Sequence, residues 1–151
     1  MSTQISLEGV EVQAFVSFVR AHSSVVRGLD RELVADHGLT INDYEVLLRL
    51  ARAPDRMMRR VDLAQQVLLT PSGITRLLDG LQRCGFVEKA ACESDARVVY
   101  AKLTDAGHEK LRQATEDHVA SIRALFGEQF SEAELRTLCD FLERLQPEVA
   151  D

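Results

Sequence analysis

Hydroxyl and guanidinium groups gather near the middle of the chain, in the segment TPSGITRLLDGLQRC that begins at Thr70. If this segment is helical, Ser72, Thr75 and Arg76 lie on one face, opposite an apolar stripe. Short hydroxyls permit close approach to a surface such as a DNA groove, and arginine is long enough to reach a guanine edge or a phosphate. These residue types at this spacing indicate hydrogen bonding to a nucleic acid.

A second group of charged side chains lies in the polar turn 92–97, between two β-prone runs. Arg97 stands there at the tip of a narrow hairpin, from which an arginine can enter a minor groove, where the potential is most negative. A basic cluster of Arg56, Arg59 and Arg60 precedes the helical segment. From Arg59 and Arg60 we expect contact with phosphates.

The distribution of charge agrees with this placement. The whole chain carries a net charge of −6, which by itself speaks against a polyanionic partner. Residues 49–97, however, hold nine basic and six acidic residues, a net charge of +3, whereas the remainder carries −9. A positive middle between acidic ends is compatible with a local nucleic-acid footprint.

Catalytic and cofactor motifs are missing from the sequence. There is no G-x-S-x-G, P-loop, G-x-G-x-x-G or HExxH, and the four histidines are dispersed. We therefore predict no enzyme activity, no cofactor and no metal site. The three cysteines form no CxxC pair, which favours a reducing compartment. We expect Cys84 and Cys139 to be buried and Cys92 to be exposed, with a depressed pKa only if Lys89 or Arg97 lies beside it.

Nothing in the sequence suggests a membrane or secretory protein. No run of eighteen uncharged apolar residues occurs, and the first residues lack the basic region of a signal peptide. A cytoplasmic location with no membrane partner is the expectation.

Hydrophobic periodicity predicts the elements that position these groups. A long first helix ends at Gly38, Thr40 caps a second helix, and a short third helix covers 61–67. A fourth helix, 70–84, is capped by Thr70 and buries Ile74, Leu77, Leu78 and Leu81. Two β-prone runs, 86–90 and 98–103, form a hairpin before two further helices, which begin after Thr104 and Ser131. The fold class is mostly α with a small β-hairpin wing (α+β), a winged helix-turn-helix in one compact domain.

Two passages resemble the MarR-type family of bacterial transcriptional regulators. One is LTINDYEVLLRLARAP followed by DLAQQVLLTPSGITRLLDGLQRCGFVEK, and it is similar to the second to fourth helices of the family. The other, DARVVYAKLTDAG, fits the wing pattern D-x-R, five residues, then L-T-x-x-G, with Asp95, Arg97, Leu103, Thr104 and Gly107. The resemblance covers Leu39 to Gly107, nearly half of the chain.

The resemblance implies a homodimer that binds a palindromic operator in double-stranded DNA. Residues 1–38 and 104–151 would form the helical dimerisation region, and 39–103 the DNA-binding region. Helix 70–84 would lie in the major groove, with Thr70, Ser72, Thr75 and Arg76 facing the bases. The wing 92–97 would enter the minor groove with Arg97, which Asp95 would orient through a charge-assisted pair.

The resemblance further implies a repressor that a small anionic, often phenolic, effector releases from DNA. The residues that would line the effector site are Arg20, His22, Tyr44 and Arg49. Two alternatives stay open. A winged helix can serve in protein–protein assembly without an operator of its own, and a regulator can respond to oxidation of a cysteine, here Cys92.

Overall fold

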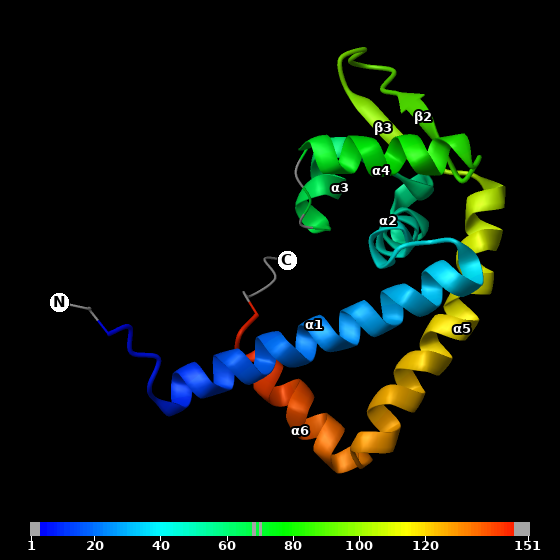
Figure 1. The fold of residues 1–151 in the computed structure, drawn as a ribbon. Coiled ribbons are helices and arrows are strands. Elements are labelled where there is room, and N and C mark those ends of the chain that lie inside the picture. The colour runs from blue at the N-terminus through cyan, green and yellow to red at the C-terminus, as the bar shows by residue number, and fades with distance from the viewer. Residues whose placement is uncertain (1–3, 68, 70, 147–151) are drawn as a thin grey trace. The chain divides into compact units, whose positions relative to one another are not determined.

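The computed structural model describes residues 4–67, 69 and 71–146, and the chain divides into two compact units, Met1–Ala114 and Thr115–Asp151. Helices dominate the first unit, and the three short strands of its small sheet lie between them in the chain (Figure 1). The elements in chain order are α1 (Val10–His37), α2 (Ile41–Arg52), the 3-10 turn η1 (Pro54–Arg56), β1 (Met57–Arg59), α3 (Arg60–Gln66), α4 (Pro71–Arg83), β2 (Val87–Ala91), β3 (Val99–Leu103), α5 (Asp105–Gln129) and α6 (Glu132–Glu143).

Local sequence signals set several helix ends. Gly38 follows α1 with φ 66°, a left-handed conformation that glycine adopts without steric cost. Thr40 Oγ1 accepts from the N–H of Asp43 at 3.0 Å, and the Asp43 carboxylate accepts from the N–H of Thr40 at 2.9 Å. Ser131 and Glu134 make the same reciprocal pair before α6. These predicted helix boundaries are confirmed.

The sheet has one strand more than the sequence predicts. Its order is β1-β3-β2, all antiparallel, with Val87 opposite Leu103 in the hairpin and Met57 opposite Lys102 at the other edge. The hairpin is confirmed, whereas the third strand, β1, is not among the predicted elements. A strand of three residues has no readable alternation, and only its pairing with β3 makes it a strand.

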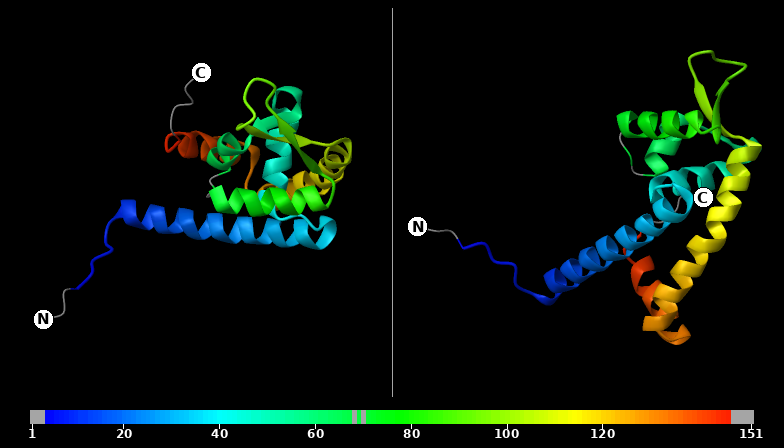
Figure 2. Two further views of the ribbon diagram at one scale, coloured as in Figure 1. Left: turned by 90° about the horizontal axis from the view of Figure 1, so that it is seen from above. Right: turned by 45° about the vertical axis from the view of Figure 1, so that its right-hand side comes forward.

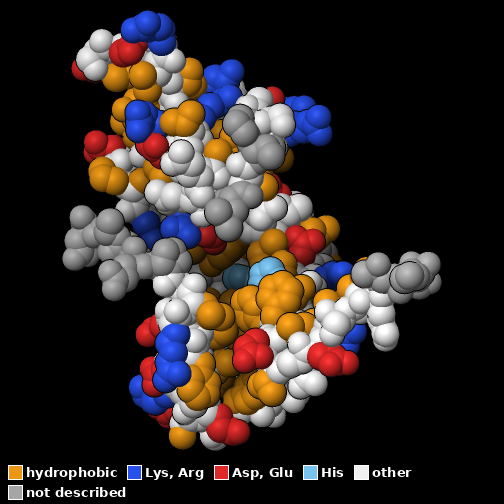
Figure 3. Space-filling view, turned by 90° about the vertical axis from the view of Figure 1, so that its left-hand side faces the viewer, with side chains coloured by type: hydrophobic (Ala, Val, Ile, Leu, Met, Phe, Trp, Pro, Cys, Tyr) orange, Lys and Arg blue, Asp and Glu red, His pale blue; other side chains and the backbone are white. Residues whose placement is uncertain are grey.

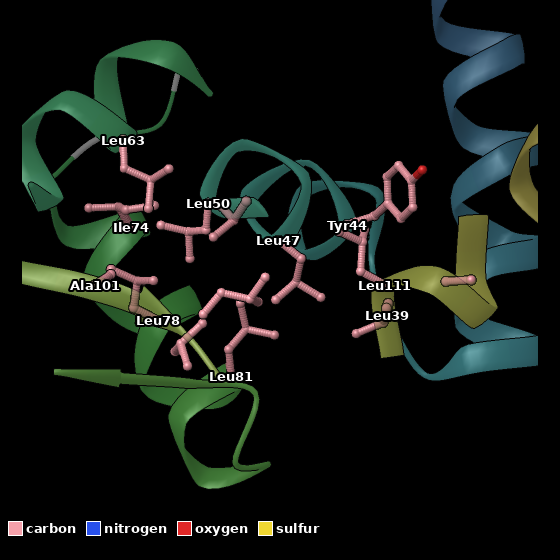
Figure 4. Close-up of a cluster of buried hydrophobic side chains, with 14 of the residues drawn as sticks. Leu39, Tyr44, Leu47, Leu50, Leu63, Ile74, Leu78, Leu81, Ala101 and Leu111 are labelled. Atoms are coloured by element: carbon pink, nitrogen blue, oxygen red, sulfur yellow. The ribbon is translucent and has the colours of Figure 1, made fainter. Parts of the chain in front are cut away.

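One apolar cluster holds the first unit together (Figure 4). Ile74, Leu78 and Leu81 of α4 are buried against Leu47 and Leu50 of α2, while Leu77 packs at the margin of the cluster. Burial of this stripe fixes the orientation of α4, so that its opposite face points to solvent. The hairpin β2–β3 projects beyond α4 as a wing (Figure 2). The unit therefore has the predicted architecture of a winged helix-turn-helix.

A tight junction joins the wing to the helix that follows it. Thr104 Oγ1 donates to the carbonyl of Gly85 at 2.6 Å and accepts from the N–H of Gly107 at 3.0 Å. The Gly107 backbone lies so close to the carbonyl of Phe86 that no Cβ fits between them. This contact explains the glycine of the L-T-x-x-G pattern.

Two cysteine predictions were wrong. Cys84 and Cys139 are exposed, not buried. Cys84 follows the last residue of α4 and precedes Gly85, where the chain leaves the apolar cluster.

In the described ranges, no helix is long and apolar enough to cross a bilayer.

Candidate nucleic-acid interface

The polar face of α4 is open to solvent. Ser72, Thr75 and Arg76 are exposed in the first two turns, and Asp79 and Arg83 continue the same face. Helical spacing of three and four residues puts these side chains in one row, opposite the buried stripe. Thr70, which the sequence also assigned to this face, lies outside the described residues. The face presents hydroxyls at the start of the helix and arginines further along.

The wing carries a preorganised arginine. Asp95 Oδ1 accepts from the backbone N–H of Arg97 at 3.0 Å and lies 3.3 Å from its Nε. The carbonyl of Asp95 accepts from the N–H of Val98 at 3.1 Å, which closes the turn. The side chain of Arg97 is 92% exposed. Asp95 thus orients the base of the guanidinium and leaves its outer N–H groups available.

Arg59 and Arg60 are adjacent but differ in environment. The guanidinium of Arg59 makes a two-pronged contact with Asp62, at 2.8 Å from Nε and 3.1 Å from Nη2. The hydrogen bonds and charge of Asp62 raise the pKa of Arg59. Arg60 is half-buried, and its Nε is buried without a hydrogen-bond partner.

The structure brings these arginines together with the wing. Arg59, Arg60 and Arg97 line one pocket of about 270 Å³, which sequence reasoning did not foresee. The remaining lining residues are Val61, Val98 and Val99. In the space-filling view, Lys and Arg side chains lie on the protruding wing, with Asp and Glu side chains among them (Figure 3).

Arg56 has a different role from its neighbours. Its Nη1 lies 3.4 Å from the carboxylate of Asp105, the first residue of α5. Asp55 and Arg56 both have φ 56°, an uncommon conformation for residues with a Cβ. This turn sends the chain from α2 into β1 and so determines where Arg59 and Arg60 lie.

The four residues assigned to an effector do not share one cavity. Arg20 and His22 are exposed on α1, where the ring centroids of Phe18 and His22 are 6.4 Å apart. Tyr44 is buried at the edge of the apolar cluster (Figure 4). Of the four, only Arg49 lines the pocket of about 450 Å³ beside α2. The other residues that line this pocket are Glu45, Leu48, Arg52, Ala53, Pro54, Met58 and Gln66.

That pocket is amphipathic. Arg49 pairs with Glu45 at 2.9 Å and lies 3.5 Å from the amide oxygen of Gln66. Leu48 and Met58 supply apolar wall, and Arg52 adds a second guanidinium. Such a combination suits an organic anion, with its charged group toward the arginines.

Cys92 lies at the start of the wing turn and is half-buried, whereas the sequence predicts it to be exposed. Its Sγ lies 3.1 Å from Oγ of Ser94. Hydrogen bonds from the side chain and backbone of Ser94, from the backbone of Asp95 and from Tyr100 lower the pKa of Cys92. The lowered pKa of Cys92 thus comes from hydrogen bonds, and not from the cationic neighbour that the sequence analysis required.

Over the part of the chain that the structure describes, no group of three or more His, Cys, Asp or Glu could hold a metal ion.

Comparison with known proteins places this geometry in a family. A sequence profile of the MarR family matches residues 37–98. The transcriptional repressor YetL of Bacillus subtilis is 34% identical over 115 residues, which cover 74% of this chain and 68% of YetL. The regulator MhqR of the same species is 25% identical over 89% of this chain and 90% of its own.

Solved structures agree with the sequence relatives. AbsC, a MarR family regulator of Streptomyces coelicolor, superposes with a TM-score of 0.82 at 29% identity, over 94% of this chain and 95% of AbsC. Sco3205 of the same species, solved in complex with DNA, gives 0.84 at 28% identity over 99% and 97%. The chain therefore belongs to the MarR family of transcriptional regulators, which are not enzymes.

Proposed function

We propose that this protein is a sequence-specific regulator of double-stranded DNA and acts as a repressor that a small anionic effector releases. The observation that carries the DNA-binding part is the arrangement of two exposed surfaces in one unit: the polar face of α4, and a wing whose arginine is held by Asp95. The DNA-bound structure of the relative Sco3205 supports the same use of the fold.

In this proposal α4, with the segment 70–84, enters the major groove. Ser72, Thr75 and Arg76 meet base edges, together with Thr70 just before the described helix. Arg97 enters the adjacent minor groove from the wing turn 92–97. Arg59 and Arg60 contact the phosphates between these two points.

The proposal includes a homodimer on a palindromic operator. Large apolar side chains are exposed on α1, among them Val10, Phe15 and Phe18, and exposed apolar groups of this size indicate an interaction surface. In the second unit Phe130 and Phe141 are exposed as well. We assign dimerisation to residues 1–38 and 104–151 and DNA binding to 39–103.

Release by an effector is the regulatory part of the proposal. The arginine-bearing pocket beside Arg49 is a suitable site for an organic anion, because charged and apolar walls face one cavity. The assignment of repression follows the relative YetL, which is a transcriptional repressor. A regulator of this kind must share a compartment with DNA, so a cytoplasmic location belongs to the same proposal.

Fluorescence anisotropy tests the proposal with DNA from directly upstream of the protein's own coding region, against scrambled DNA, over a series of salt concentrations. We expect tight binding that prefers the upstream DNA and weakens steeply with salt, because binding releases counterions from the phosphates. Absence of binding to any duplex at low salt would refute the DNA-binding function. That outcome would favour a winged-helix module for protein assembly.

A further inference from the structure

The pocket between the wing and the start of α3 has an unusual charge balance. Arg59, Arg60 and Arg97 line it, and no carboxylate is among its lining residues. Its volume of about 270 Å³ is far larger than the roughly 30 Å³ share of one water molecule. The cavity therefore has room for a tetrahedral anion, and its walls carry the opposite charge.

Arg60 is the residue whose position calls for such an occupant. Its Nε is buried without a hydrogen-bond partner, although arginine is always charged at physiological pH. A buried donor left unsatisfied is costly, more so in a charged group. A bound group that supplies the missing acceptor, such as an anion or a water molecule, satisfies a donor of this kind.

The other two arginines are each oriented by a carboxylate. The carboxylate of Asp62 accepts hydrogen bonds from Nε and Nη2 of Arg59, and the carboxylate of Asp95 accepts one from Nε of Arg97. Both guanidinium groups keep N–H donors on Nη1 that these pairs do not use. The strand register brings Arg59 and Arg97 near each other. Arg59 of β1 lies opposite Tyr100 of β3, and β3 begins two residues after Arg97.

We propose that Arg59, Arg60 and Arg97 form a pocket that holds one phosphate of the DNA backbone, with Arg60 as its anchor. The exposed valines favour a phosphodiester over a free oxyanion. Val61 is 61% exposed and Val99 is 40% exposed, so apolar surface borders the charged cavity. A deoxyribose attached to the phosphate covers such methyl groups, whereas inorganic phosphate leaves them in water.

This inference rests on the proposed DNA-binding function and deepens it. One phosphate held by residues of α3, β1 and the wing turn fixes the wing against the duplex strand at the edge of the minor groove, so that Arg97 contacts this phosphate at the point where the wing enters the groove. Phosphate contacts set position and carry no sequence information. The pocket therefore contributes to affinity on every sequence equally.

The test uses the full-length protein, a short duplex of mixed sequence and the variant Arg60→Met. Met keeps an unbranched side chain of adaptable shape and removes the unsatisfied donor. We expect roughly tenfold weaker binding, and a slope of log K against log salt that is smaller by about one, as for the loss of one phosphate contact. We also expect an equal or higher thermal midpoint, because an unpaired buried charge has been removed.

The control is Arg112→Gln, which removes the same charge from an exposed position in the same unit but outside both arginine-lined pockets. It should leave the salt slope closer to that of the wild type. If Arg60→Met lowers stability and leaves the slope unchanged, Arg60 is structural and the inference is wrong. If the wild type binds no duplex at low salt, the proposed DNA-binding function is refuted, and the phosphate-binding role of this pocket is refuted with it.

Inorganic phosphate at constant ionic strength separates the two sources of the anion. If it raises the thermal midpoint of the wild type more than that of Arg60→Met while the two proteins share one DNA salt slope, the occupant is a free oxyanion. That result would overturn the role of the DNA backbone. We expect the opposite: a changed DNA slope and little difference in the response to phosphate.

Discussion

Arg97 separates binding from stability at the scale of one residue. Its side chain is almost fully exposed, and its pair with Asp95 is a surface ion pair of small worth for folding. Replacing Arg97 by Ala should therefore weaken operator binding by about 1–3 kcal/mol. The free energy of unfolding should stay within about 0.5 kcal/mol. Anisotropy titration and thermal unfolding measure the two quantities.

Arg112→Ala is the matched control, because Arg112 forms a similar exposed pair with Glu109 on α5 at 2.7 Å. Loss of the same charge there should change DNA affinity far less. Equal losses in the two variants would mean that Arg97 acts through net charge alone and that the wing makes no specific contact.

Cys92 gives a second prediction for a single residue, on pH. Hydrogen bonds to its sulfur, led by that of Ser94, favour the thiolate and lower the pKa. In a background with Cys84→Ser and Cys139→Ser, alkylation of Cys92 should accelerate with a midpoint below the ordinary thiol value of about 8.5. Ser94→Ala should move the midpoint upward. If the midpoint is the same with and without the Ser94→Ala substitution, the hydrogen bond of Ser94 is not the origin of the lowered pKa.

The same variants address the redox alternative. A lowered pKa increases the fraction of thiolate, the form that peroxide oxidises. If Cys92 controls DNA binding, peroxide releases the wild type from its operator and leaves Cys92→Ser bound. If both proteins stay bound to the operator in the presence of peroxide, the redox-responsive hypothesis is wrong.

At the scale of elements, the junction between wing and α5 depends on Gly107. A Cβ at this position meets the carbonyl of Phe86, a backbone group that cannot swing aside. Gly107→Ala should thus destabilise the protein by about 1–3 kcal/mol, as overpacking does elsewhere. Urea unfolding measures the change in the free energy of unfolding.

Gly28→Ala is the contrast, because Gly28 lies inside α1, where an added Cβ would meet no atom within 4 Å. There the substitution should stabilise by roughly 0.8–1 kcal/mol through helix propensity. Destabilisation by both would show that the loss at Gly107 does not come from its contact with Phe86.

Elements differ in how well the sequence predicts them. The capping boxes at Thr40 and Ser131 and the buried stripe of α4 depend on residues three or four apart, so they are readable in the sequence. β1 is not, because three residues form a strand only through pairing with β3. The polar face of α4 follows from the period of a single helix. The meeting of Arg60 with Arg97 depends on the turn at Asp55 and on the β1–β3 register, which no local pattern encodes.

The effector residues mark the same limit. Arg20, His22, Tyr44 and Arg49 come from two helices, and periodicity alone does not say which side chains point into one cavity. The structure leaves three of them outside the pocket that Arg49 lines, and it adds Arg52 and Met58. Tyr44 instead belongs to the buried cluster.

At the scale of the whole molecule, the exposed aromatic side chains predict self-association. In the first unit Phe15 is 64% exposed, and in the second unit Phe141 is 53% exposed; exposed apolar groups of this size favour burial against a partner. The wild type should sediment as a dimer. Phe141→Glu should shift it toward the monomer, because a carboxylate buried at an apolar interface is strongly disfavoured. Analytical ultracentrifugation measures the state, and circular dichroism verifies that helices are retained.

Dimerisation and DNA binding are then linked by mass action. A dimer holds two recognition helices on two half-sites, so the second contact is made at high effective concentration. Phe141→Glu should lower the apparent affinity for a palindromic site far more than for a single half-site. Gln65→Glu, which adds a carboxylate at an exposed position of α3, should leave the dimer intact. If Phe141→Glu remains dimeric and binds the palindrome as the wild type does, the interface does not include this part of α6.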